Sequence, residues 1–290
     1  MGTPERERSK SDPQQLLLQA LETCWENYRS ELKNCRSEFT EDAVHDLRVA
    51  TRRILALIQL LNSISPHLRL KKMARAFKDQ LDEFDDLRDT QVILGELSTI
   101  LQELPQLDDF EQHLRSHEEQ MFKDLHKELK QRDTSEIADW IRKTRDTLEE
   151  ETHTNLKALI LDAVDDAFLD VRQRLGWVDV ARSATIHRVR VAFKAFRYMV
   201  EIVHPLLKDF PPATIKQMNE YQTLMGNIQD AEVFAGTLAD FAAHAPFADQ
   251  DAVQHYYEKR RSEAISTFVK AMDRLHAFWR PAPDQPFPWE

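Results

Sequence analysis

Glycine, cysteine and long apolar runs are scarce in this chain, and each shortage excludes a class of protein. The 290 residues include five glycines and few β-branched runs, while Leu, Ala, Glu, Gln, Lys and Arg are plentiful, which is typical of an all-helical protein. Cys24 and Cys35, the two cysteines, are too few for a disulfide framework and favour a reducing cytoplasm. No apolar run approaches the ~20 residues that span a bilayer, and the chain does not open with a signal-peptide pattern.

The net charge of −11 is unevenly distributed along the chain. Residues 47–78 contain eight Lys or Arg and no acidic residue, and residues 186–219 contain six Lys or Arg and two acidic residues. The two windows therefore carry +8 and +4, which leaves −23 on the rest of the chain. A local basic field on an acidic protein favours a specific polyanion site and argues against non-specific coating of nucleic acid.

One stretch of the sequence occurs twice, at 44–61 and at 186–203. The matched residues, 142 positions apart, are His45 and His187, Arg48 and Arg190, Val49 and Val191, Ala50 and Ala192, and Arg52 and Lys194. A second match, offset by 141 residues, pairs Asp89 with Asp230, Gly95 with Gly236 and Arg75 with Lys216. This repetition predicts two copies of one helical bundle, divided near residue 150.

Helix starts and breaks predict an ordered series of helices. We expect them at 13–36, 41–65, 67–85, 86–104, 109–132, 135–151, 156–175, 185–207, 213–225, 228–243 and 251–279. Asp12, Thr40 and Thr185 are the expected N-caps, and Gly176 and Gly226 are expected to end helices. The resulting division is a disordered N-terminus (1–11), two bundle halves (12–150 and 151–280) and a Pro-rich, non-helical tail (281–290).

Both copies of the repeat carry a stripe of cations beside an apolar stripe. His45, Arg48 and Arg52 are three and four residues apart, as are His187 and the cations after it, so each set lies along one line of a helix. Each stripe begins one residue after the apolar stripe, about 100° around the helix, at the margin of the core. Like charges at this spacing repel one another, which indicates a binding role rather than a solvated face.

The motif formed by these residues resembles the CHAD family, the conserved-histidine α-helical domains. Its first half is matched by His45, Arg48, Val49, Arg52 and Arg53, and its second half by His187, Arg190, Lys194, Arg197 and Tyr198. The resemblance covers residues 14–280 and implies two pseudo-symmetric four-helix bundles with a basic channel between them. It also implies a non-catalytic cytoplasmic protein that binds inorganic polyphosphate, associated with polyphosphate granules.

The chemistry of polyphosphate agrees with this pattern. A linear polyanion without base edges needs a row of cations, in which Arg forms forked contacts, Lys supplies a point charge and His gains a proton near the anion. No metal, cofactor or nucleophile is required. The predicted polyphosphate-binding residues are His45, Arg48, Arg52, Arg53, Lys72, Arg75, Lys78, His187, Arg190, Lys194, Arg197 and Lys216. Replacing either Arg48 or Arg190 by Glu is expected to weaken binding with little loss of fold.

Two other function classes compete with this interpretation. The dipeptide His45-Asp46 is typical of HD-type metal phosphohydrolases, but the repeat places Arg188 where the acid belongs. The chain could instead be a helical scaffold for an acidic protein or RNA, although Tyr198 is the only aromatic candidate for base stacking near the cations.

Two further pairs of residues are considered for a metal site and for a structural role. His113 and His117, at i and i+4, suit one metal but lack an evident third ligand. Asp89 and Asp230 follow expected helix breaks, so a structural role as a cap or an arginine partner is predicted for both.

Overall fold

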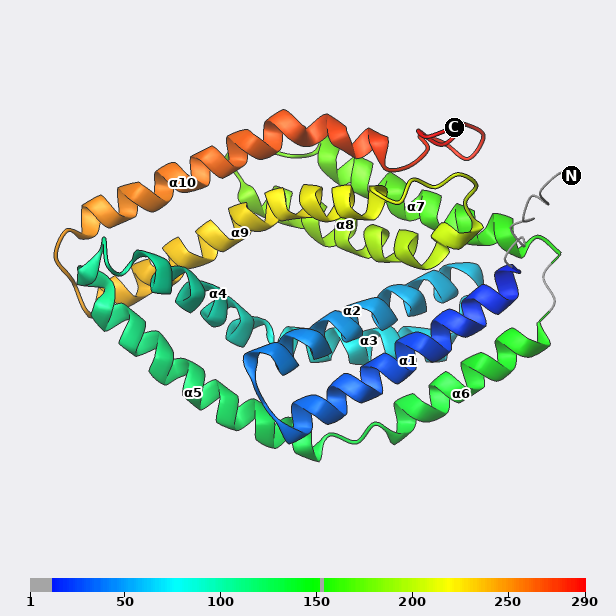
Figure 1. The fold of residues 1–290 in the computed structure, drawn as a ribbon, viewed down its shortest axis with the longest axis horizontal. Helices are drawn as coiled ribbons and strands as arrows, with labels where there is room; N and C mark the ends of the chain where they lie inside the picture. The colour runs from blue at the N-terminus through cyan, green and yellow to red at the C-terminus, as the bar shows by residue number, and fades with distance from the viewer. Residues whose placement is uncertain (1–11, 152–153) are drawn as a thin grey trace, which may run out of the picture.

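The computed structural model describes residues 12–151 and 154–290, and every regular element within them is a helix (Figure 1). The elements in chain order are α1 (Pro13–Ser37), α2 (Glu41–Ile64), α3 (Leu68–Glu83), α4 (Asp85–Ile100), η1 (Pro105–Leu107), α5 (Asp108–Gln131), α6 (Ser135–Glu150), α7 (Leu156–Gly176), α8 (Ser183–Val203), η2 (His204–Leu206), α9 (Thr214–His244), α10 (Gln250–Ala271) and η3 (Met272–Ala277). The all-α class is confirmed. The predicted disorder of residues 1–11 lies outside the described residues. No helix of the described part is long and apolar enough to cross a bilayer.

Two of the three predicted N-caps are confirmed. The carboxylate of Asp12 accepts a hydrogen bond from the Gln14 amide at 3.2 Å, and Pro13 occupies the first turn of α1. The Thr40 hydroxyl accepts from the Ala43 amide at 3.2 Å at the start of α2. Because these caps satisfy amides that a helix leaves unpaired, they fix where α1 and α2 begin.

The third cap and the Gly226 break are wrong, whereas the predicted end of a helix at Gly176 is confirmed. The helix α8 begins at Ser183, ahead of Thr185, whose hydroxyl instead accepts from the Asp179 amide at 3.0 Å in the preceding loop. Gly176 is the last residue of α7 and ends it without a left-handed backbone, since the described glycines have no positive φ. Gly226 lies buried inside the 31 residues of the uninterrupted α9. A glycine inside a helix costs about 1 kcal/mol relative to alanine, which tertiary packing outweighs here.

Several helices also end at other residues than predicted. The helix α4 ends at Ile100, before the expected residue 104, and Pro105 begins a 3-10 turn instead of stopping an α-helix. The helix α8 gives way to the 3-10 turn η2 at His204, because Pro205 has no N–H for the helical ladder. The last α-helix ends at Ala271 and continues as η3.

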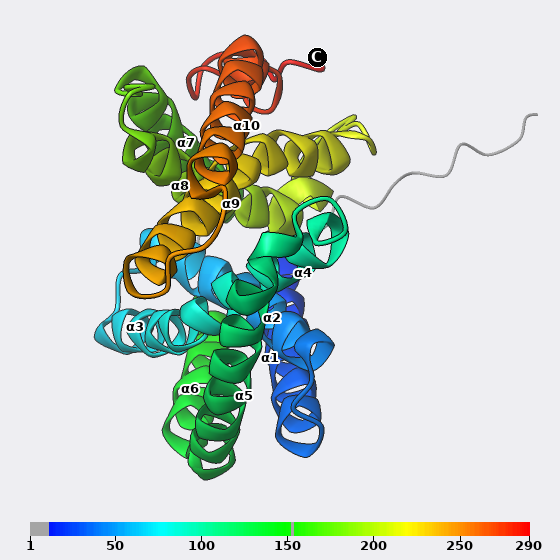
Figure 2. The same ribbon diagram turned by 90° about the vertical axis from the view of Figure 1, so that its left-hand side faces the viewer.

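The helices of the two halves pack in the same order. In the first half, α2 lies between α1 and α3, and in the second half α8 lies between α7 and α9. The helices α2 and α8 pack against each other at the middle of the molecule, where the two halves meet (Figures 1 and 2). The division into two bundles at residue 150 stays a prediction.

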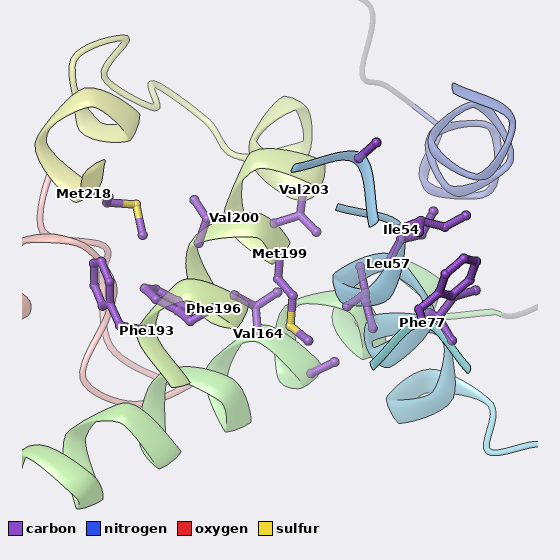
Figure 3. Close-up of a cluster of buried hydrophobic side chains, with 14 of the residues drawn as sticks. Ile54, Leu57, Phe77, Val164, Phe193, Phe196, Met199, Val200, Val203 and Met218 are labelled. Carbon is purple, nitrogen blue, oxygen red and sulfur yellow. The ribbon is translucent and has the colours of Figure 1, made fainter. Parts of the chain in front are cut away.

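One apolar core runs through this meeting point. Ile54 and Leu57 of α2 and Phe77 of α3 have no exposed surface, and Met199 and Phe196 of α8 belong to the same cluster (Figure 3). Because side chains of both halves fill one core, the contact between α2 and α8 is fixed by apolar burial on both sides.

A second cluster joins the far ends of the two halves. It is formed by α4, α5, α9 and α10, where the Phe234 ring stacks on the Tyr257 ring with centroids 3.9 Å apart. Phe110 of α5 meets the same Phe234 at 5.9 Å. The two halves are therefore joined at a second place, where the C-terminal part of α9 meets α4 and α5.

The C-terminal tail (281–290) has no helix, as predicted, and it follows Trp279 and Arg280, which pack against α8 and α7. Trp279 has no exposed surface, and its indole N–H donates to the Asp165 carboxylate at 2.7 Å. Arg280 pairs with the same carboxylate at 2.6 Å. The ring of Trp289 stacks on Phe287 with centroids 4.9 Å apart. The tail therefore belongs to the fold.

Candidate functional site

The two cationic stripes meet where α2 packs against α8. Burial, followed by repulsion from Arg52, Arg190, Arg48 and Arg197, lowers the pKa of Lys194 to about 6. Two of these arginines lie on α2 and two on α8. Because charges act at such strength only over short distances, cations that are 142 residues apart in the sequence share one site.

Arg48 is neutralised by the protein itself. Its side chain is 4% exposed and pairs with the Asp85 carboxylate at 2.7 Å, and a second guanidinium N–H donates to the Leu81 carbonyl at 2.9 Å. Both partners lie at the junction of α3 and α4. Arg48 therefore anchors α2 to that junction. A glutamate here would face Asp85, so the expectation that Arg48→Glu spares the fold is wrong.

Arg197 is likewise engaged. It pairs with Glu201 one turn along α8, donates to the Gln222 side chain on α9 at 3.1 Å, and lies over the Tyr198 ring at 4.1 Å. Both Arg197 and Tyr198 are buried. The Arg197 side chain therefore ties α8 to α9, and it covers the aromatic ring that a nucleobase would need for stacking.

Three cations at the same site have no such partner. Among the described residues, no hydrogen-bond acceptor and no carboxylate within 4 Å is found for Arg52, Arg190 or Lys194, and the Nε of Arg190 is buried and unpaired. Burial first, and then Arg48, lower the pKa of Arg52 to about 10. These three side chains are therefore packed together without the anions that balance Arg48 and Arg197.

Asp230 of α9 is an acidic side chain close enough to Arg190 to feel its charge. Burial raises the pKa of its carboxyl, and Arg190 is the strongest influence in the opposite direction. Burial also raises the pKa of Asp89, its counterpart on α4. Both residues lie inside helices, so the prediction that they cap helix starts is wrong. They balance part of the arginine charge at a distance.

Both motif histidines lie at the exposed edge of the site. His187 contacts the Gln229 side-chain oxygen through Nδ1 at 2.7 Å, and His45 is exposed on the first turns of α2. Arg53 is half exposed, with its Nε 3.9 Å from a Glu201 oxygen. These groups are accessible from water at the margin of the half-buried cations Arg52, Arg190 and Lys194.

The four predicted residues on α3 and α9 lie elsewhere on the surface. Lys72 sits over the Trp140 ring of α6 at 5.8 Å. Arg75 and Lys78 pair with acids one turn along α3, at 3.8 Å and 2.5 Å respectively. Lys216 is exposed on α9. The structure does not join these side chains to the half-buried cations of the α2–α8 contact, and their role in binding stays a prediction.

The sequence interpretation did not anticipate the acids that neutralise part of the site. Glu201 lies four residues after Arg197, a spacing that signals an ion pair in any helix. Asp85 gives no such local signal, because it lies 37 residues from Arg48. Recognising it requires the three-dimensional arrangement.

No metal centre is formed by the described side chains. Groups of three or more His, Cys, Asp or Glu that could hold an ion are not found among them. His113, one of the two histidines considered for a metal, packs against the Phe241 ring with centroids 5.3 Å apart. The cations of the α2–α8 contact remain the chemically distinctive feature.

Comparison with known proteins identifies the family. A model of the CHAD domain matches residues 19–239, which include both cationic helices. The chain belongs to the CHAD family. The crystal structure of the CHAD domain from the plant Ricinus communis is similar to it, with a TM-score of 0.68 and 16% sequence identity over 96% of this chain and 96% of that chain. At this identity, the likeness shows that the two share the CHAD fold. A search of the curated proteins found no match.

Proposed function

We propose that this CHAD protein binds inorganic polyphosphate, without catalysis, where α2 meets α8. The observation that carries the proposal is the group of three cations, Arg52, Arg190 and Lys194, that lack a hydrogen-bonded acid among the described residues. Removing an unpaired charge from water costs several kcal/mol. A bound oxyanion offsets this cost for Arg52 and Arg190, and it favours protonation of Lys194, whose pKa is lowered in the free protein.

A phosphate chain suits this arrangement better than other polyanions. It carries about one charge per phosphate along a line, and two arginine forks and one ammonium match such a ligand. The CHAD resemblance implies the same ligand. RNA is disfavoured, because the nearby Tyr198 ring is covered by Arg197. A cytoplasmic role at polyphosphate granules is part of the proposal, and the free thiols of Cys24 and Cys35 accord with a reducing compartment.

Titration with long-chain polyphosphate at several salt concentrations, with RNA as competitor, tests this function. If the three cations each contact a phosphate, at about 0.7 counterions released per contact, log K falls with log salt at a slope of about −2. Binding that survives physiological salt and excess RNA supports the proposal. Displacement by RNA, or by an acidic peptide, would favour the scaffold alternative instead.

Two charge-reversal variants test where polyphosphate binds. Arg190→Glu removes a forked contact and adds repulsion, so an affinity loss of about tenfold or more is expected. Arg145→Glu on α6 is the matched control, because Arg145 is exposed on a helix that packs on α1 and α3, on the opposite side of the molecule from α8 (Figure 1). Equal losses in the two variants would exclude the α2–α8 contact as the site.

A further inference from the structure

Arg48 and Arg190 occupy matched positions on α2 and α8, yet their surroundings differ in one decisive way. Asp85 pairs with Arg48 at 2.7 Å. The position that matches Asp85 in the second half, 141 residues later, is Gly226. The repeat therefore keeps the arginine and omits the carboxylate that neutralises it.

The structure places Gly226 beside Arg190, in the same way that it places Asp85 beside Arg48. A Cβ added to Gly226 would lie 3.8 Å from Arg190 Nε and 4.0 Å from Arg190 Nη2. A side chain at this position would thus point at the guanidinium, as Asp85 does at that of Arg48. With hydrogen in its place, the guanidinium lies against bare helix backbone.

A second difference removes the other partner of the arginine. The helix is interrupted at Phe84, between α3 and α4. There the Leu81 carbonyl accepts one hydrogen bond from the Phe84 amide at 3.2 Å and another from the Arg48 guanidinium at 2.9 Å. The helix α9 continues without a break through Gly226. Its carbonyls are therefore engaged in the i to i+4 ladder, and Arg190 Nε is left buried and unpaired.

We infer that Arg190 is the phosphoryl-binding arginine and that a phosphate of the ligand takes, over Gly226, the place that the Asp85 carboxylate takes over Arg48. This inference rests on the proposed function. Lys194 and Arg52 flank the phosphate, and Arg48 is a positioning residue. The Asp85 carboxylate reaches Arg48 from the solvent side, because its side chain is 56% exposed whereas that of Arg48 is 4% exposed. Arg190 is only half-buried, and a Cβ at Gly226 would meet no neighbour other than the Arg190 guanidinium within 4 Å, so there is room for a ligand atom beside that guanidinium.

Supplying the missing carboxylate tests the inference. In Gly226→Asp the new side chain pairs with Arg190 and competes with phosphate, so affinity for tripolyphosphate and for long-chain polyphosphate, measured by calorimetry, falls about tenfold to a hundredfold. Gly226→Asn has the same shape without the charge and is expected to lose less. Gly236→Asp makes the same change on the same helix, at an exposed position with no atom near its Cβ, and serves as the control.

The possible outcomes separate the inference from the proposed function. Tight binding by the original chain together with equal affinities of Gly226→Asp and Gly236→Asp would overturn the phosphate position and leave the function intact. Absence of polyphosphate binding by the original chain would overturn the function itself.

A second pair of variants keeps the test independent of how Gly226→Asp folds. Arg190→Gln should lose affinity and keep or raise the melting temperature, because it removes an unbalanced charge. Arg48→Gln should lower the melting temperature and lose less affinity, because it breaks the pair with Asp85. A loss of affinity in Arg48→Gln at least as large as that in Arg190→Gln would contradict the assignment.

Discussion

Polyphosphate binding should draw a proton onto Lys194, and this is the sharpest test of the buried cationic site. In the free protein, burial and four neighbouring arginines lower the pKa of this ammonium from its ordinary 10.5 to about 6, so at pH 8 nearly all of it is neutral. A phosphate chain beside it replaces repulsion by attraction and raises the pKa. If the pKa in the complex exceeds 9, about 0.9 proton is taken up per complex at pH 8, and affinity falls nearly tenfold per pH unit from about 7 to 8.5.

Calorimetric titration in buffers of different ionisation enthalpy measures this uptake. Long chains should be used, so that terminal phosphates, which titrate near neutrality, contribute little. The groups that face Lys194 are arginines of α2 and α8 and the carboxylate of Asp230 on α9. In Lys194→Arg the charge is permanent, so proton uptake at pH 8 disappears and affinity at pH 8.5 exceeds that of the original chain. Zero uptake in the original chain, or equal uptake in both chains, would refute the reasoning.

The same pKa governs the stability of the free protein. Between pH 6 and 10 the unfolded chain holds a proton on Lys194 that the folded chain lacks, so the free energy of unfolding rises with pH across this window. The drop from 10.5 to about 6 sets an upper limit of about 6 kcal/mol, at about 1.4 kcal/mol per unit. Urea unfolding of Lys194→Met should lack this slope, and an unchanged slope would contradict the assignment.

Three further changes test the histidine edge and the core. His45→Ala should lower affinity for polyphosphate, because it removes an exposed hydrogen-bond donor at the edge of the site, and an unchanged affinity would argue against that role. Asp165→Ala should lower the free energy of unfolding in urea by about 3–5 kcal/mol, because it leaves the buried Arg280 guanidinium unpaired. Tyr28→Phe removes the buried hydrogen bond to Gln80 at 2.7 Å and should cost about 1–2 kcal/mol in the same assay, and no change in stability would contradict it.

Periodicity was enough to place the cations on two helices but could not say which of them are compensated. The three- and four-residue steps locate Arg48 and Arg190 at the margin of a core, because helical geometry is local. Whether each arginine is neutralised depends on the position of Asp85 and on the interruption of the helix at Phe84, and tertiary packing sets both. The predicted break at Gly226 failed for the same reason, since packing outweighed a weak helix propensity.

The net charge of a sequence window likewise predicted only part of the site. The +8 window drew attention to α2 and α3, yet two cations of α3, Arg75 and Lys78, pair with acids just beyond the window, Asp79 and Asp82. Local sums register the sign of a segment. They do not register which side of a helix each charge occupies or which neighbour neutralises it.

The buried aromatic residue Trp279, which follows α10, limits where this protein can be cut. The family match ends at residue 239, inside α9, whereas Trp279 packs on Phe196 of α8 with centroids 5.8 Å apart and has no exposed surface. A fragment trimmed to residue 239 would expose Phe196 to water on the helix that carries Arg190 and Lys194. Proteolytic loss of the chain from Trp279 onward should therefore register as lost anion affinity, because Trp279 packs on the apolar side of α8 and holds that helix in place.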